Sequence, residues 1–169
     1  MHKEDKNNSI DDIEGIWEKW FPLVPPSIIE SSCLNAMEPL GNQISKLIDR
    51  NVQVGFFSQK DASFLYQKTG ELLAQIAEIT FMLGLEYGVR DKCQPRTDAF
   101  VSENTKEALP LINIATEPAN KFIVRLVGGL AASKIPKDIC FSIAQDSGEI
   151  LLYCSVQCFR LGLNYSTWV

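Results

Sequence analysis

Two stretches of this chain are similar to each other, and this internal similarity constrains the fold more than any other feature. Residues 70–87 read GELLAQIAEITFMLGLEY, and residues 148–165 read GEILLYCSVQCFRLGLNY. At an offset of 78 residues, eight of the 18 positions are identical. Unrelated helical segments would share about one or two, so the match predicts a tandem duplication. The identical pairs are Gly70/Gly148, Glu71/Glu149, Leu73/Leu151, Phe81/Phe159, Leu83/Leu161, Gly84/Gly162, Leu85/Leu163 and Tyr87/Tyr165.

A weaker match upstream sets the extent of the predicted repeats. Glu38-Pro39 resembles Glu117-Pro118 at an offset of 79 residues, so one residue has been gained or lost between the two blocks. The repeats then cover residues 27–90 and 103–166, within a single domain of residues 27–169. We expect an all-α bundle of about seven helices, in which two three-helix repeats are related by a pseudo-two-fold axis and follow an N-terminal helical arm.

Helical periodicity and capping signals predict where these helices begin and end. Pro39 and Pro118 fit the first turn of a helix, and Ser58 resembles the N-cap of a long third helix. Whether the third helices are continuous at Gly70 and Gly148 stays open, with a break favoured at Gly148 because Asp and Ser precede it. The predicted helices span residues 27–37, 40–52, 59–90, 103–115, 119–134 and 137–165.

Small residues recur along the third helix of each repeat. In the first repeat they stand at spacings of three and four residues around one phenylalanine, which predicts a seam for close helix packing. The expected partner is the same helix of the other repeat, with Gly84, Gly88 and Gly162 at the contact. The seam residues are Gly70, Ala74, Ala77, Phe81, Gly84 and Gly88, and their counterparts are Gly148, Leu152, Ser155, Phe159, Gly162 and Ser166.

The N-terminal region lies outside the repeats. Residues 1–9 are polar and predict a disordered tail, and residues 10–26 predict a helical arm with a proline-rich linker. Trp17, Trp20 and Phe21 on this arm form the best candidate surface for contact with another protein. Alternatively, the arm packs against its own domain and covers an apolar end of the bundle. Exchange of the arm between two copies of the chain would be consistent with both interpretations.

Gln67 and Tyr87 also recur, as Gln145 and Tyr165. The structural interpretation is that the tyrosine rings are buried at the helix ends while their hydroxyls stay hydrated. The functional interpretation is that the four side chains line a ligand cleft at the pseudo-axis. The structural interpretation is favoured.

Composition and charge narrow the classes of function. The chain of 169 residues has a net charge of −5 and an estimated pI of 4.9, which disfavours nucleic-acid binding. The longest uninterrupted apolar run, residues 126–132, is shorter than the about 17–25 residues needed to cross a bilayer, so no membrane association is expected. The polar N-terminus lacks a secretory signal, and the five irregularly spaced cysteines favour reduced thiols in the cytoplasm.

Few residues could carry catalysis or hold a metal. The single histidine, His2, lies in the predicted tail, and the lack of a second histidine argues against the usual histidine-containing triads, zinc proteases and ferritin-like di-iron sites. Cys154 and Cys158 have ligand-like spacing, and Cys140 could join them, but their repeat counterparts Ile76 and Thr80 favour a role as small core residues. Glu71, Glu78 and Glu86 fit a solvated helix face better than an acid–base site. We expect no catalytic residue, metal or cofactor.

The absence of catalytic residues favours a non-enzymatic protein-binding module. Such a module would regulate or inhibit a partner protein of unknown identity and would form a homodimer. The alternative is a small-molecule sensor that binds its ligand between the two repeats. An enclosed apolar pocket near Tyr87 and Tyr165 would favour the sensor, whereas an exposed apolar patch near Trp17 and Trp20 would favour protein binding.

Overall fold

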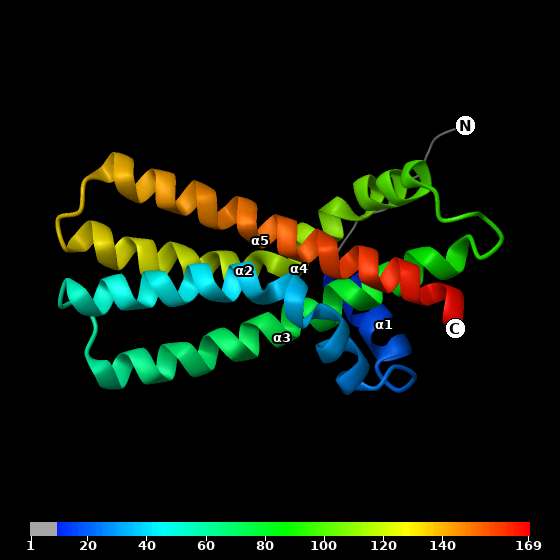
Figure 1. Cartoon of the computed structure of the whole chain (residues 1–169), viewed down its shortest axis with the longest axis horizontal. Helices are drawn as coiled ribbons and strands as arrows, with labels where there is room; N and C mark the ends of the chain where they lie inside the picture. Colours follow the sequence, from blue (N-terminus) through cyan, green and yellow to red (C-terminus); the bar gives the residue numbers. More distant parts are fainter. Residues whose placement is uncertain (1–9) are drawn as a thin grey trace.

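The computed structural model describes residues 10–169, which form an all-α fold (Figure 1). No strand occurs within these residues, in agreement with the predicted fold class. The predicted tail, including His2, lies outside the described residues. The helices are α1 (Ile10–Trp20), α2 (Pro26–Gln53), α3 (Gln59–Arg90), α4 (Asp98–Ala132) and α5 (Lys137–Tyr165), followed by a short 3-10 helix, η1 (Ser166–Trp168).

Residues 10–169 form five α-helices where the sequence predicted about seven, because two of the expected breaks do not occur. Pro39 lies inside α2, and Pro118 lies inside α4. A proline removes one helical hydrogen bond and bends the helix, and both helices change direction along their length (Figure 1). The adjoining Leu40 and Ala119 are fully buried, so packing holds each helix together across its proline. The predicted break at Gly148 was also wrong, since α5 is continuous there.

The helix ends follow the local sequence more closely. Ser58 Oγ accepts a hydrogen bond from the Asp61 backbone N at 3.1 Å, and Asp61 Oδ2 accepts one from the Ser58 backbone N at 2.9 Å. This reciprocal capping box starts α3 at the predicted position. Thr97 caps α4 in a similar way, because its side chain accepts a hydrogen bond from Phe100 N at 3.2 Å.

Two helical hairpins, α2–α3 and α4–α5, make up most of the fold. Their connecting loops lie at the same end of the molecule, and α3 and α5 run in the same direction (Figure 1). Near the loops α2 contacts α4, where Asn51 Nδ2 donates to Leu126 O at 2.9 Å. Toward the other end α3 and α5 converge and form the most extensive helix–helix contact of the fold.

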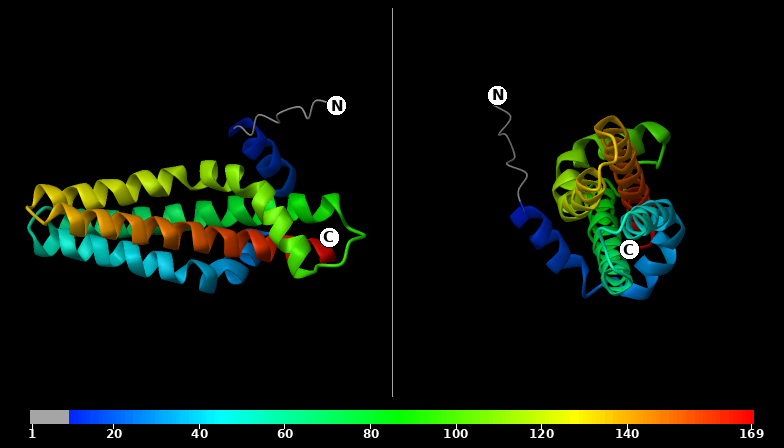
Figure 2. Two further views of the ribbon diagram at one scale, coloured as in Figure 1. Left: turned by 90° about the horizontal axis from the view of Figure 1, so that it is seen from above. Right: turned by 90° about the vertical axis from the view of Figure 1, so that its left-hand side faces the viewer.

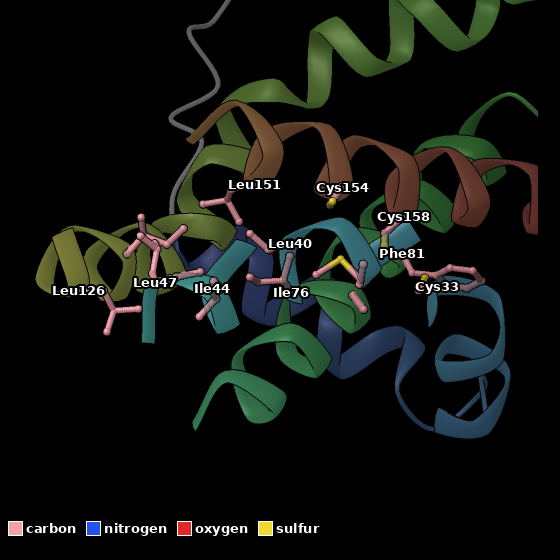
Figure 3. Close-up of a cluster of buried hydrophobic side chains, with 14 of the residues drawn as sticks. Cys33, Leu40, Ile44, Leu47, Ile76, Phe81, Leu126, Leu151, Cys154 and Cys158 are labelled. Carbon is pink, nitrogen blue, oxygen red and sulfur yellow. The ribbon is translucent and has the colours of Figure 1, made fainter. Parts of the chain in front are cut away.

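The core consists of two adjoining clusters of buried side chains. The larger one lies between the hairpins, and Figure 3 shows residues of α2, α3, α4 and α5 meeting in it. The smaller one surrounds Phe159 on α5. Helix α1 lies obliquely against the side of the bundle (Figure 2) and contributes Trp20 to the larger cluster and Ile13 to the smaller. The helix of the predicted arm therefore packs against the chain's own core.

Helix α3 is long and apolar enough, by length and composition alone, to cross a membrane. Uninterrupted apolar runs do not reveal this property, because polar residues are scattered along α3. Most of its apolar window is buried inside the protein. Such burial is expected of a central helix that neighbouring helices cover.

Candidate protein-binding groove

The three glycines predicted at the seam lie buried where α3 meets α5. A Cβ atom added at Gly84 would overlap the carbonyl oxygen of Phe159, and one added at Gly162 would overlap that of Phe81. At Gly88 it would overlap the side chain of Ser166. The backbones of the two helices therefore approach so closely that only glycine fits at these positions.

The four residues proposed to line a ligand cleft do not come together. The Tyr87 ring packs edge-on against Phe159, with centroids 5.7 Å apart, and Tyr165 lies 5.6 Å from Phe81. Gln67 and Gln145 are exposed, and each donates a hydrogen bond to the glutamate four residues further along its helix, at 3.4 and 3.3 Å. Because Tyr87 lies 20 residues beyond Gln67 on α3, the two are separated by about 30 Å along the axis.

The three aromatic residues of the arm have different surroundings. Trp20 is only 3% exposed, and its Nε1 donates to Glu86 Oε2 at 2.9 Å. Trp17 stacks on Phe21 with ring centroids 4.4 Å apart, and these two side chains are 36% and 40% exposed. Trp20 is therefore an internal anchor of α1, while Trp17 and Phe21 remain accessible.

Glu86 holds α1 on the bundle. Its Oε2 also accepts a hydrogen bond from Lys19 Nζ at 2.6 Å, and Arg90 Nε lies 3.9 Å from Oε1. Burial by itself would raise the pKa of Glu86, but the hydrogen bonds from Lys19 and Trp20, with the charges of Lys19 and Arg90, hold the pKa below its ordinary value. The carboxylate is thus ionised and fully engaged in a structural contact.

An open groove of about 690 Å³ lies between α2 and α3. We call it the α2–α3 groove. Leu34, one of its lining residues, is 72% exposed. The apolar residues that line it are Ile29, Cys33, Leu34, Met37, Leu73, Ala74 and Ala77. The remaining lining residues are Glu30, Asn35, Glu38, Gly41, Asn42, Gly70 and Glu78.

Half of the predicted small-residue seam contributes to this groove. Gly70, Ala74 and Ala77 line the α2–α3 groove, and Gly70 and Ala74 are exposed. The sequence had placed these residues against α5. That expectation fails because α3 and α5 diverge toward the hairpin loops (Figure 1), so Gly70 and Ala74 are left exposed.

Three carboxylates border the groove without a compensating cation. Glu30 and Glu38 belong to α2, and Glu78 faces them from α3. None of the described residues that line the groove is lysine or arginine, and within residues 10–169 no ion pair involves any of the three. Burial raises the pKa of Glu78, and the neighbouring charge of Glu30 raises it further. The groove therefore has a negative potential.

A second groove, of about 440 Å³, lies between α4 and α5. Its eight lining residues all occupy positions equivalent to lining residues of the α2–α3 groove, at offsets of 79 for α4 and 78 for α5. Leu152 replaces Ala74 and fills space that is open in the first groove. The lining residues are Asn113, Ile114, Thr116, Glu117, Asn120, Gly148, Leu151 and Leu152.

A third hollow, of about 620 Å³, separates α1 from α3. Trp17 and Ile79 give it apolar walls, and Glu14 and Glu18 add two further carboxylates. Glu78 lines both this hollow and the α2–α3 groove. The hollow and the α2–α3 groove therefore adjoin at Glu78.

Three of the four buried cysteines within residues 10–169 form a cluster that the sequence predicted only in part. Figure 3 places Cys33 of α2 beside Cys158 of α5, with Cys154 one turn away, whereas Cys140 lies at the start of α5. A hydrogen bond with Cys33 and burial raise the pKa of Cys158, and burial raises that of Cys154. No group of three or more potential ligand side chains within residues 10–169 is arranged to hold a metal. Cys33 was missed because its proximity to Cys158 is a tertiary contact.

Comparison of the chain with protein-family models, curated proteins and solved structures finds no significant match. Function must therefore be argued from the grooves, their side chains and their charges.

Proposed function

We propose that this protein is a non-enzymatic protein-binding module whose α2–α3 groove receives a helical segment of a partner protein. The observation that carries the proposal is an open, apolar groove between two long helices, bordered by carboxylates that have no cation. Binding of an amphipathic helix in such a groove is a common mode of protein recognition, in which apolar residues anchor the helix and charges at the edges select it.

A small-molecule sensor remains the second candidate. The volume of the groove falls within the range of about 300–1,000 Å³ that is typical of ligand sites. Such sites, however, enclose most of the ligand surface, whereas Glu30, Leu34, Glu38 and Ala74 are all exposed at this groove. Where Tyr87 and Tyr165 would have formed the cleft, α3 and α5 are in direct contact. An elongated segment of a protein suits the open groove better.

We also propose that the two hairpins arose by tandem duplication, so that the repeating unit is two long helices rather than three. Aromatic residues support this, since Phe81 packs on Tyr165 while their counterparts Phe159 and Tyr87 pack on each other. The equivalent lining of the two grooves is further support, because five of the eight matching pairs differ in residue type and did not contribute to the sequence match. After duplication the first groove kept small residues, and the second was partly filled.

Three further proposals concern the cellular location of the protein, its effect on the partner and its oligomeric state. We propose a cytoplasmic protein that regulates or inhibits its partner. We also propose that it forms a homodimer through Trp17 and Phe21, which are exposed and stacked on α1. Exposed aromatic pairs of this kind are frequent anchors of protein interfaces.

A pair of reciprocal substitutions tests the proposed function. Ala74→Leu introduces into the first groove the residue that the second groove carries, and Leu152→Ala makes the opposite change as a matched control. Proteins bound by the wild type from a cell extract are expected to be retained by Leu152→Ala and lost with Ala74→Leu, while both variants keep the helical circular dichroism spectrum. Retention of every bound protein by a folded Ala74→Leu variant would contradict the proposal.

A further inference from the structure

We infer that the occupant of the α2–α3 groove is an amphipathic helix that carries lysine or arginine on both sides of its apolar face. This inference rests on the proposed protein-binding function and specifies the chemistry of the partner. It combines the shape of the groove, the placement of its carboxylates and the contrast with the second groove.

The dimensions of the groove fit a short helix. Its α2 wall extends from Ile29 to Asn42, which corresponds to about 20 Å of helix, the length of about 13 residues. Its α3 wall presents Gly70, Ala74 and Ala77 at spacings of four and three residues, so these small side chains lie along one face of α3. Small residues in such a row allow the side-chain ridge of another helix to approach closely.

The carboxylates border the groove on both sides. Glu30 and Glu38 are eight residues apart on α2, about 12 Å along its axis, and Glu78 lies on the opposite wall. A helix lying in the groove would bring side chains of both its edges within reach of these residues. Lysine and arginine suit these edge positions, because their aliphatic stems cover apolar surface while the charged ends reach the carboxylates.

The surroundings of Glu78 support a cationic occupant. This side chain is partly buried and faces the like charge of Glu30, and both effects raise its pKa and make its ionised form less favourable than it would be in water. A cation placed between α2 and α3 would remove part of that cost. The net charge of −5 on the whole chain would also accelerate the approach of a basic segment.

The second groove, between α4 and α5, occupies the equivalent position but has fewer carboxylates and, in place of Ala74, a larger side chain. It has one carboxylate, Glu117, where the first groove has three, and Asn113 stands in the place of the exposed Leu34. Leu152 narrows it further. We expect the basic helix to prefer the first groove.

Three synthetic helical peptides with one shared apolar face test the inference. Their flanking positions carry lysine, glutamine or glutamate, and binding of each labelled peptide to the full chain is measured by fluorescence anisotropy at low and physiological salt. The lysine peptide should bind at least about tenfold more tightly than the glutamine peptide at low salt, and the difference should shrink as salt rises. The glutamate peptide should bind most weakly.

Variants of the chain locate the site. The triple variant Glu30→Gln/Glu38→Gln/Glu78→Gln should reduce the advantage of the lysine peptide to within about twofold and leave the glutamine peptide unchanged. Glu117→Gln in the second groove is the matched control and should preserve the advantage. Ala74→Leu should weaken binding of every peptide that binds.

The outcomes separate the inference from the proposed function. Equal binding of all three peptides, blocked by Ala74→Leu, would overturn the inference and leave the groove as a protein-binding site. Binding of no peptide to the wild type would overturn both. Binding of the lysine peptide that is insensitive to both Ala74→Leu and the triple variant would place it elsewhere on the protein and would also overturn both.

Discussion

Gly84 of α3 and Gly162 of α5 lie in reciprocal contacts, each against the backbone of the other's helix. A Cβ atom at Gly84 would lie 2.7 Å from the backbone nitrogen of Leu163, and one at Gly162 would lie 2.8 Å from the carbonyl carbon of Phe81. Backbone atoms cannot move aside as a flexible side chain can. The closest approach of the two hairpins therefore depends on two glycines at equivalent positions.

Alanine at either glycine is expected to destabilise the protein. Gly84→Ala and Gly162→Ala should each lower the free energy of unfolding by about 1–3 kcal/mol, because the added methyl group forces α3 and α5 apart. Gly70→Ala and Gly148→Ala are matched controls, since a Cβ there meets no atom within 4 Å. The controls should gain up to about 1 kcal/mol from higher helix propensity. Urea unfolding measures all four, and equal values for the two pairs would contradict the contact.

Loss of the Glu86 carboxylate should loosen α1. Glu86→Gln weakens the hydrogen bonds from Lys19 and Trp20 to Oε2. Because the pKa of Glu86 is lowered in the folded protein, its stabilising contribution is present at neutral pH and is lost as pH falls through that lowered value. The variant should lose about 1–2 kcal/mol of unfolding free energy at neutral pH.

Denaturant titrations monitored by tryptophan fluorescence at neutral and acidic pH measure this effect. The difference between Glu86→Gln and the wild type should narrow in acid. Glu18→Gln, an exposed change on the same helix, should have little effect. A destabilisation of Glu86→Gln that persists unchanged in acid would show that its cause is not the charge.

Local signals in the sequence were sufficient for some features of the fold. The capping residues Ser58 and Asp61 predicted the start of α3 because both act within one turn. The pairing of Gly84 with Gly162 followed from the repeated pattern. Pro39 and Pro118 predicted helix starts that the structure does not show. Burial of the neighbouring Leu40 and Ala119 outweighs the local cost of an interrupted helical hydrogen bond.

The α2–α3 groove could not be predicted from the sequence, for a different reason. Its existence depends on where α3 and α5 diverge, and that point is set by tertiary packing. The signal that was available, the row Gly70, Ala74 and Ala77, was assigned to the contact with α5 because it continues into Gly84 without interruption. The same row faces a neighbouring helix at one end and an open groove at the other.

Glu78 should produce a pH dependence of opposite sign to that of Glu86. Its pKa is raised in the folded protein by burial and by Glu30, so its ionisation reduces stability as pH rises above the pKa of the unfolded chain. Glu78→Gln should therefore be more stable than the wild type at neutral pH, by about 0.5 kcal/mol or less because solvent screens this site. The difference should vanish in acid, and Glu117→Gln is the control. A less stable Glu78→Gln variant at neutral pH would show that its carboxylate is already compensated.

The thiols should separate into one accessible group and four protected ones. Cys93 is exposed in the segment between α3 and α4, whereas Cys33, Cys140, Cys154 and Cys158 are buried. The raised pKa of Cys154 and Cys158 further lowers their reactivity, since the thiolate is the reactive form. An aromatic disulfide reagent should label about one thiol rapidly and the rest only with denaturant. Cys93→Ser should abolish the fast phase. Rapid labelling of Cys33 would instead show that the α2–α3 groove, which it lines, opens into the core.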